Sequence, residues 1–274
     1  AESVHSWLAR ADVDGVVVVH GTDTMSYSAS ALAFLLGPLP KPVVLTGSQR
    51  PLVDVRTDAR ANLVDAVLAA TLKIPEVVVA FASHLLRGCR TVKSDAWSFD
   101  AFTSPSCRPL VELGVGVDVA GHVLAARPLA PLDLRIDPRV LAVRVFPGFD
   151  PALLARAIDH GGVRGLVLEA YGTGNLPNGA GSSLIPTIER ASDADVPVVV
   201  VSQCLRGRVE LSRYEGGAAA ARAGAIDGGD MTVEAALAKL MVGLGRCSGL
   251  DAIRRYMLED VAGERTPLGE TPNA

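Results

Sequence analysis

A hydroxyl, a carboxylate and an amine are the groups in this sequence with the clearest potential for chemistry. Thr22 and Asp23 follow four consecutive valines, a histidine and Gly21, and Lys93 lies in a polar stretch further along the chain. A threonine hydroxyl is a weak nucleophile, and a lysine whose pKa is lowered by burial can take its proton. A neighbouring carboxylate can orient that amine or hold an ammonium group of a substrate. The three residues therefore predict catalysis by an activated hydroxyl.

The spacing of these residues is equally compatible with purely structural roles. Residues 22–24 can simply cap the helix that follows, because Thr and Asp are favoured helix N-caps. Lys93 can be a solvated loop lysine. Ser48 and Asn175, which also follow predicted strands, fit ordinary turn chemistry.

Other chemistries find no motif. The sequence has no Gly-rich dinucleotide motif, no P-loop and no GxSxG elbow. Its four cysteines show neither CxxC spacing nor clustering with the five histidines, so the sequence gives no sign of a metal site. A net charge of −4 with scattered arginines predicts no nucleic-acid partner, and no apolar run reaches the length of a membrane span.

The elements that position these groups read as alternating strands and helices. Residues 16–19 predict a strand buried on both faces, since β-branched side chains suit a packed, pleated surface. We expect residues 83–106 to form an irregular hairpin or loop. Further strands are predicted at 42–46, 77–82, 114–119, 122–125, 141–146, 165–170 and 196–202, and helices at 2–10, 24–36, 58–71, 151–159, 183–194, 217–223, 232–244 and 250–259.

This alternation in both halves predicts the α/β class, with two α/β domains and mainly parallel sheets. We expect a larger N-terminal domain over residues 1–126, a proline-rich extended linker over 127–140 and a smaller C-terminal domain over 141–274. In open α/β sheets, functional side chains collect at the carboxyl ends of strands. Thr22, Ser48 and Asn175 all follow such ends.

Several longer motifs resemble segments of a known protein family. The segment HGTDTM at residues 20–25 resembles the second signature of the bacterial-type L-asparaginase family, and TGSQRP at 46–51 is similar to a later segment of it. The Lys93 region resembles the lysine-bearing hairpin of that family. Residues 171–175 (YGTGN), 230–235 (DMTVEA) and 263–267 (GERTP) look like the cytoplasmic type I branch. The resemblance runs in order along essentially the whole chain.

The resemblance implies hydrolysis of L-asparagine to L-aspartate and ammonia through an acyl-enzyme, without metal or cofactor. Thr22 matches the second threonine of the family and Lys93 its lysine. Asp23 matches the aspartate that also grips the substrate's α-ammonium group. Gly21 to Asp23 would receive the α-carboxylate, and the backbone carbonyl of Ser48 would take the leaving NH₂ group.

Asn175 matches an asparagine that reaches the site of a neighbouring subunit in the family. The resemblance therefore implies a homodimer or a homotetramer, and a cytoplasmic location.

The chain also departs from the family pattern. The family's first signature, Thr-Gly-Gly-Thr-Ile, carries the usual nucleophile, and the 14 residues before Gly15 hold no match to it. Either an N-terminal segment is missing, which the start at Ala1 favours, or this is a natural short form. We expect the chain as printed to fold poorly and to release little ammonia, since loss of a central strand exposes sheet edges. Turnover would instead make Thr22 the nucleophile and Lys93 its base.

Two other functions fit parts of the pattern. The amidase subunit of a glutamyl-tRNA amidotransferase shares these motifs and works with a tRNA-handling partner. A catalytically impaired asparagine-binding module would keep the pocket at Thr22 and Asp23 without the nucleophile.

Overall fold

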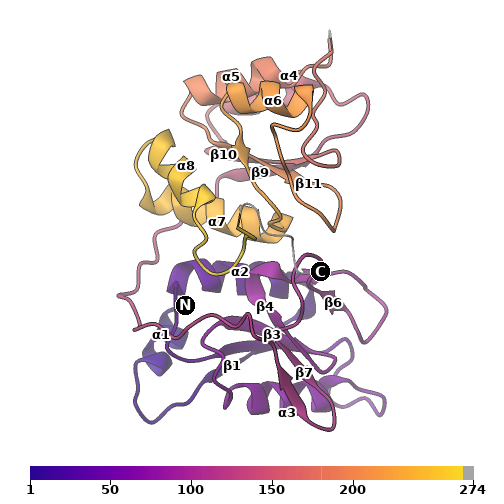
Figure 1. Cartoon of the computed structure of the whole chain (residues 1–274), viewed down its shortest axis with the longest axis vertical. Helices are drawn as coiled ribbons and strands as arrows, with labels where there is room; N and C mark the ends of the chain where they lie inside the picture. The colour runs from indigo at the N-terminus through magenta and orange to yellow at the C-terminus, as the bar shows by residue number, and fades with distance from the viewer. Residues whose placement is uncertain (180, 268–274) are drawn as a thin grey trace. The chain divides into compact units, whose positions relative to one another are not determined.

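The computed structural model describes residues 1–179 and 181–267, which form two compact units (Figure 1). The first unit comprises Ala1–Leu134 together with Val261–Glu264. The second comprises Arg135–Asp260 and the described residues from Arg265 onward. Both units are α/β, as predicted from the alternation of strands and helices. The end of the N-terminal domain at residue 126 and the start of the C-terminal domain at residue 141 stay predictions.

A six-stranded mixed sheet forms the centre of the first unit. Its strand order is β1-β2-β3-β4-β7-β8. The first three strands are parallel and the last three pair antiparallel. The strands are β1 (Val16–Val19), β2 (Val43–Thr46), β3 (Val77–Phe81), β4 (His84–Arg87), β7 (Val111–Leu113) and β8 (Val117–Val119).

Helices cover both faces of this sheet. Helix α2 (Met25–Leu36) packs on one face and α3 (Ala59–Ala69) on the other, while α1 (Glu2–Leu8) precedes β1 (Figure 1). Strands β2 and β3 are completely buried, because apolar side chains project from both of their faces against these helices. A small separate hairpin joins β5 (Val92–Lys93) to β6 (Phe102–Thr103).

Strand β1 corrects one expectation. Residues Val16–Val19 do form a strand, but the prediction that it is buried on both faces is wrong. Among the described residues β1 pairs only with β2. Its first three valines are half-buried, and Val19 is 73% exposed. A short apolar run indicates a strand without showing whether that strand lies at the centre or at the edge of the sheet.

Strand β4 corrects a second expectation. The prediction of an irregular hairpin or loop over residues 83–106 is wrong at its start, because His84–Arg87 is a strand of the main sheet, paired antiparallel with β3. The two turn residues, Ala82 and Ser83, have φ values of 49° and 62°. Hairpin turns with two positive φ values usually carry Asn-Gly, so Ala-Ser at this position is no turn signal.

Two shorter segments also differ from the strands predicted for them. The strand expected at 114–119 is the hairpin of β7 and β8, which begins at Val111. Residues 122–125 are not a strand. Instead, the backbone N–H of Leu124 donates to Glu76 Oε1 over 2.7 Å. The acceptor is therefore a side-chain carboxylate and not the backbone carbonyl group of a neighbouring strand.

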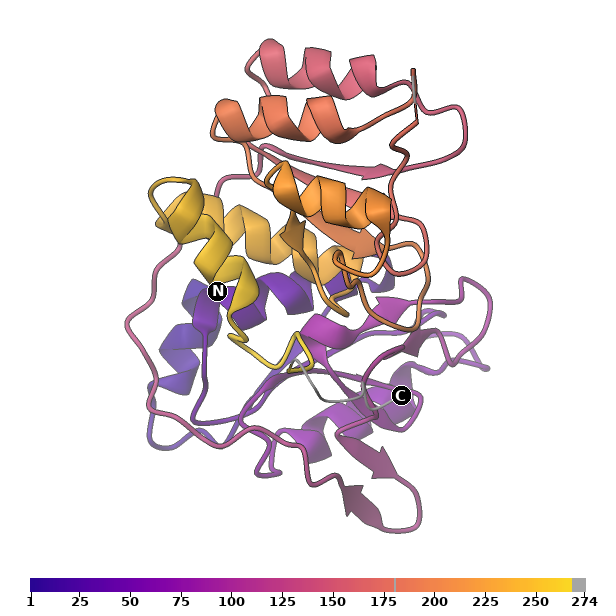
Figure 2. The ribbon, with the colours of Figure 1, turned by 45° about the horizontal axis from the view of Figure 1, so that its top comes forward.

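The second unit contains a four-stranded sheet, entirely parallel, in the order β12-β11-β10-β9. Helices α4 to α6 cover one face, while α7 packs on the other face with α8 against it (Figure 2). The elements are β9 (Val140–Arg144), α4 (Pro151–Asp159), β10 (Gly165–Ala170), α5 (Ile185–Asp193), β11 (Val198–Ser202), α6 (Glu215–Arg222), β12 (Ile226–Asp227), α7 (Val233–Arg246) and α8 (Leu250–Leu258).

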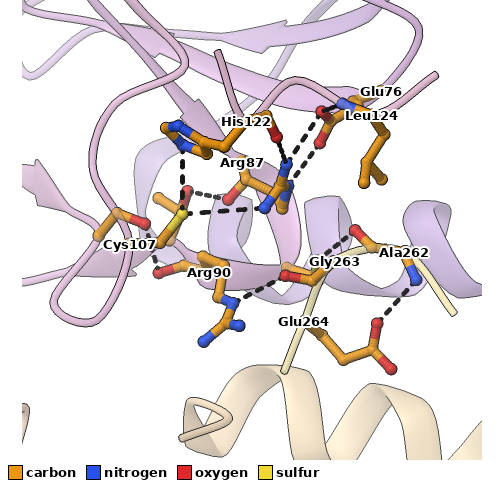
Figure 3. Close-up of polar contacts among 12 residues, drawn as sticks. Glu76, Arg87, Arg90, Cys107, His122, Leu124, Ala262, Gly263 and Glu264 are labelled. Carbon is orange, nitrogen blue, oxygen red and sulfur yellow. Dashed lines mark hydrogen bonds and ion pairs between the residues drawn. The ribbon is translucent and has the colours of Figure 1, made fainter. Parts of the chain in front are cut away.

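The chain returns to the first unit after α8. Arg90 Nε donates to the carbonyl oxygen of Gly263 over 2.8 Å (Figure 3). Cys89 Sγ donates to the carbonyl oxygen of Ala262 over 3.3 Å. Gly263 has φ +80°, and a Cβ atom there would lie 2.7 Å from Arg87 Nε. Only glycine meets both conditions without strain.

Within residues 1–179 and 181–267, each helix is too short or too polar to cross a lipid bilayer.

Candidate active site

The turn after β1 brings Thr22 and Asp23 to the carboxyl end of the sheet. His20 fixes this turn: its Nδ1 lies 2.7 Å from the carbonyl oxygen of Gly21, and its Nε2 lies 3.0 Å from Ser28 Oγ. Because a carbonyl oxygen only accepts, Nδ1 donates to the carbonyl oxygen of Gly21. The ring thus ties the turn to helix α2.

The structure does not support the alternative in which residues 22–24 only cap a helix through their side chains. A 3₁₀ turn, η1 (Thr22–Thr24), leads into α2, with Gly21 and Thr24 at the two N-cap positions. Neither N-cap residue makes a side-chain capping hydrogen bond. The side chains of Thr22 and Asp23 are directed to another partner.

That partner is Lys93. Its Nζ donates to Thr22 Oγ1 over 2.9 Å and to Asp23 Oδ1 over 2.7 Å. The Lys93 side chain is 19% exposed, while that of Asp23 is 91% exposed. The hydrogen bond from Lys93 and its positive charge lower the pKa of Asp23 below its ordinary value of 3.8. The structure therefore joins a hydroxyl, an amine and a carboxylate from the β1–α2 turn and strand β5.

Gln49 completes the surroundings of Thr22, and its role was missed from the sequence. Thr22 Oγ1 donates to Gln49 Oε1 over 3.2 Å. The strand register explains the contact: Val19 pairs with Thr46, so Thr22 and Gln49 each lie three residues beyond a paired position. The carboxyl ends of neighbouring parallel strands meet at one edge of a sheet, so such residues come close together.

The turn that carries Gln49 is anchored to helix α3. The Asp58 carboxylate accepts hydrogen bonds from the backbone N–H groups of Gln49, at 2.9 and 3.1 Å, and of Arg50, at 3.1 Å. Asn62 Nδ2 donates to Asp58 Oδ2 over 3.1 Å and to the carbonyl oxygen of Gly47 over 3.0 Å. Ser48 lies inside this anchored turn, and its part in substrate binding stays a prediction.

Asn175 belongs to the second unit. It lies in the exposed turn after β10, where its backbone N–H and carbonyl groups both bond to Tyr171, at 2.9 and 3.0 Å. Its contribution to a site stays a prediction. In the described part of the chain, no three His, Cys, Asp or Glu side chains gather as a metal site would require.

Comparison with known proteins gives matches along both units. The model of the N-terminal asparaginase domain matches residues 1–124, and that of the glutaminase/asparaginase C-terminal domain matches residues 139–257. L-asparaginase 1 of Escherichia coli strain K12 is 40% identical over 265 residues, which cover 93% of this chain and 76% of that protein.

A solved structure agrees with these matches. The thermostable L-asparaginase from Thermococcus kodakarensis superposes with a TM-score of 0.90 at 37% identity, covering 97% of this chain and 80% of that one. One glutamyl-tRNA(Gln) amidotransferase subunit, from Pyrococcus abyssi, is 37% identical over 264 residues, which cover 92% of this chain but 59% of that protein. The two domain models and these relatives establish that the chain belongs to the asparaginase family.

Proposed function

We propose that this protein hydrolyses L-asparagine to L-aspartate and ammonia, with Thr22, Asp23 and Lys93 as its catalytic group. One observation carries the proposal: Lys93 Nζ contacts both Thr22 Oγ1, at 2.9 Å, and Asp23 Oδ1, at 2.7 Å. A hydroxyl within hydrogen-bond reach of a base that a third group orients is the arrangement that activates a nucleophile. The match to E. coli L-asparaginase 1 supports the choice of substrate.

The reaction follows from this geometry in two halves. Once the Lys93 ammonium has released a proton to solvent, its amine takes the Thr22 proton while Oγ1 bonds to the carboxamide carbon and the C=O electron pair moves to oxygen. The C–N bond then breaks, and the leaving nitrogen takes the proton from Lys93 and departs as ammonia. Water adds to the resulting ester, giving its proton through Lys93 to Thr22 as the ester bond breaks and L-aspartate leaves.

Substrate binding uses the same turn. One oxygen of the Asp23 carboxylate meets Lys93, and the carboxylate is exposed enough to accept a hydrogen bond from the substrate's α-ammonium group as well. Backbone groups of Gly21 to Asp23 receive the α-carboxylate. The backbone carbonyl of Ser48 accepts from the carboxamide NH₂ group, which favours its departure as ammonia.

The assembly proposed for this function is a homodimer or a homotetramer in the cytoplasm, in which Asn175 serves the site of a neighbouring subunit. The resemblance to the type I branch supports both statements. Light scattering gives the mass in solution, and an Asn175→Ala variant that keeps full activity would remove that residue from the site.

Ammonia release from L-asparagine tests the proposed function. The chain as printed is compared with Thr22→Ala and with Thr24→Ala, a matched control that removes a hydroxyl two residues away. The chain as printed is expected to release little ammonia, and we expect Thr22→Ala to abolish the turnover that does occur and Thr24→Ala to keep it. A folded chain that binds asparagine in calorimetry without releasing ammonia would be the binding module instead. Co-purification with tRNA and a second protein would point to the amidotransferase subunit.

A further inference from the structure

A pocket of about 640 Å³ opens beside the candidate active site, between the segment that links β2 to α3 and the loop that joins β5 to β6. Sites that take small organic molecules have volumes of about 300–1,000 Å³. The side chains that give this pocket its character are Gln49, Arg50, Arg56, Trp97, Ser98 and Phe99. Gln49 also contacts Thr22 Oγ1, so the pocket adjoins the candidate active site.

The positive charge of the pocket comes mainly from Arg56. Arg50 Nε pairs with Asp54 over 3.1 Å, which offsets the charge of Arg50. Arg56 is exposed, and within residues 1–179 and 181–267 it makes no hydrogen bond or ion pair. No Asp or Glu among the described residues lines the pocket. A planar guanidinium group matches a planar carboxylate, and one uncompensated charge favours a carboxylate over a doubly charged phosphate.

Two aromatic side chains give the pocket a flat apolar surface. Trp97 is 96% exposed and Phe99 is 38% exposed. In the described part of the chain, neither ring stacks on another aromatic ring or on a cation. An aromatic ligand would remove this apolar surface from water and stack on the indole ring.

The loop that carries Trp97 is held in place by hydrogen bonds. Asp95 Oδ1 accepts from the backbone N–H groups of Trp97, over 2.6 Å, and of Ser98, over 2.8 Å. These bonds lower the pKa of Asp95, so the carboxylate stays ionised and keeps both of them. Gln49 Nε2 donates to the carbonyl oxygen of Ser98 over 3.1 Å and ties the loop to the opposite wall. A wall that is ordered before the ligand arrives lowers the entropic cost of binding.

We propose that this pocket binds an aromatic carboxylate, with the ring against Trp97 and Phe99 and the carboxylate on Arg56. Two sources offer this chemistry. One is a free aromatic acid. The other is a larger amide, a β-aspartyl derivative of an aromatic amino acid, whose aspartyl end lies in the candidate active site. Binding at the pocket does not depend on which hydroxyl of the enzyme attacks.

Fluorescence of Trp97 measures this binding without any turnover. Trp7→Phe makes Trp97 the only tryptophan, since the sequence has two. This parent protein is titrated with 3-phenylpropanoate and with β-aspartyl-phenylalanine, and 3-phenylpropanol is the control ligand that lacks the carboxylate. Arg56→Met removes the guanidinium group. Arg108→Met, which replaces an exposed arginine outside the pocket, is the matched control.

We expect both carboxylates to change the Trp97 emission to saturation, and 3-phenylpropanol to bind at least about tenfold more weakly, because it forms no hydrogen bond to a charged partner. Arg56→Met should weaken both carboxylates by about tenfold, while Arg108→Met should match the parent. Because Arg56 is exposed and unpaired within the described residues, its replacement leaves the fold intact.

The two carboxylates distinguish the sources of the ligand. Tighter binding of β-aspartyl-phenylalanine identifies the larger amide, whereas equal or weaker binding identifies the free acid. An emission that neither carboxylate changes, or affinities that Arg56→Met leaves unaltered, would overturn the inference. Ammonia release plays no part in this readout, so failure of the proposed function would leave it unaffected.

Discussion

Lys93 links two acceptors of different character with a single ammonium group. Thr22 offers a neutral hydroxyl and Asp23 a carboxylate, both at hydrogen-bond distance. Asp23 is exposed, so solvent screens the ion pair and its value for stability is small. The contact matters because it fixes where the amine lies relative to the hydroxyl.

The pKa of Asp23 gives a direct measure of this contact. Lys93 lowers the pKa of Asp23 below 3.8, so the ion pair contributes fully above that value and is lost as the pH falls through the lowered pKa. We expect an NMR titration of the Asp23 carboxyl carbon to show this low pKa in the wild type. In Lys93→Met, the pKa should return towards 3.8. Lys73→Met serves as the control, and an equal shift there would contradict the assignment.

At the scale of elements, the sequence locates the site through its strands. The runs of valine predicted strands β1 and β2 correctly. The polar residues that follow these strands, Thr22 and Gln49, are in contact in the structure. The helix predicted at 151–159 and the strand predicted at 165–170 coincide with α4 and β10. Apolar runs and helix starts of this kind are local signals, and they were sufficient for most elements.

The remaining features depend on contacts that lie far apart in the sequence. β4 was missed because its turn at Ala82 and Ser83 lacks Asn-Gly and is stabilised by Asn62, which accepts the Ala82 N–H at 3.1 Å. Gln49 was missed because its role depends on the register between β1 and β2. The contact of Lys93 with Thr22 joins residues 71 positions apart, which spacing alone does not reveal.

Asn62 is the residue on which these elements converge. It is buried, and it bonds Gly47 in the β2 turn and Ala82 in the β3–β4 turn. We expect Asn62→Leu to lower the free energy of unfolding by about 2–4 kcal/mol, since it leaves buried backbone groups without partners. Urea denaturation measures this loss. Val64→Ala, an exposed change on the same helix, is the control, and equal midpoints for the two variants would contradict the prediction.

At the scale of the whole molecule, a buried ion pair joins distant parts of the first unit. Arg87 Nε and Nη2 donate to the Glu76 carboxylate over 2.5 and 3.1 Å, and Nη2 also donates to the carbonyl oxygen of His122 over 2.8 Å (Figure 3). Burial alone would lower the pKa of Arg87, but the hydrogen bond and charge of Glu76 outweigh it and raise that pKa. The pair thus fixes β3, β4 and the segment before the linker.

Breaking this pair should be costly. Glu76→Gln leaves the Arg87 charge buried without its counter-ion, and we expect a loss of about 3–5 kcal/mol in the free energy of unfolding. Urea denaturation followed by circular dichroism measures it. Asp12→Asn, which breaks the exposed pair with Arg10, should leave the midpoint unchanged. A Glu76→Gln midpoint equal to that of the wild type would show that the pair is dispensable.

The central claim is that Lys93 activates the Thr22 hydroxyl for the hydrolysis of L-asparagine. The most direct measurement is ammonia release by the wild type, Thr22→Ala and Thr24→Ala, with acid-quenched wild-type samples analysed by mass spectrometry. We predict that turnover, although low for the chain as printed, falls by about 10³-fold or more only in Thr22→Ala, and that an aspartyl group appears on the peptide that contains Thr22. A folded wild-type chain that releases no ammonia, or an aspartyl group on another peptide, would contradict this claim.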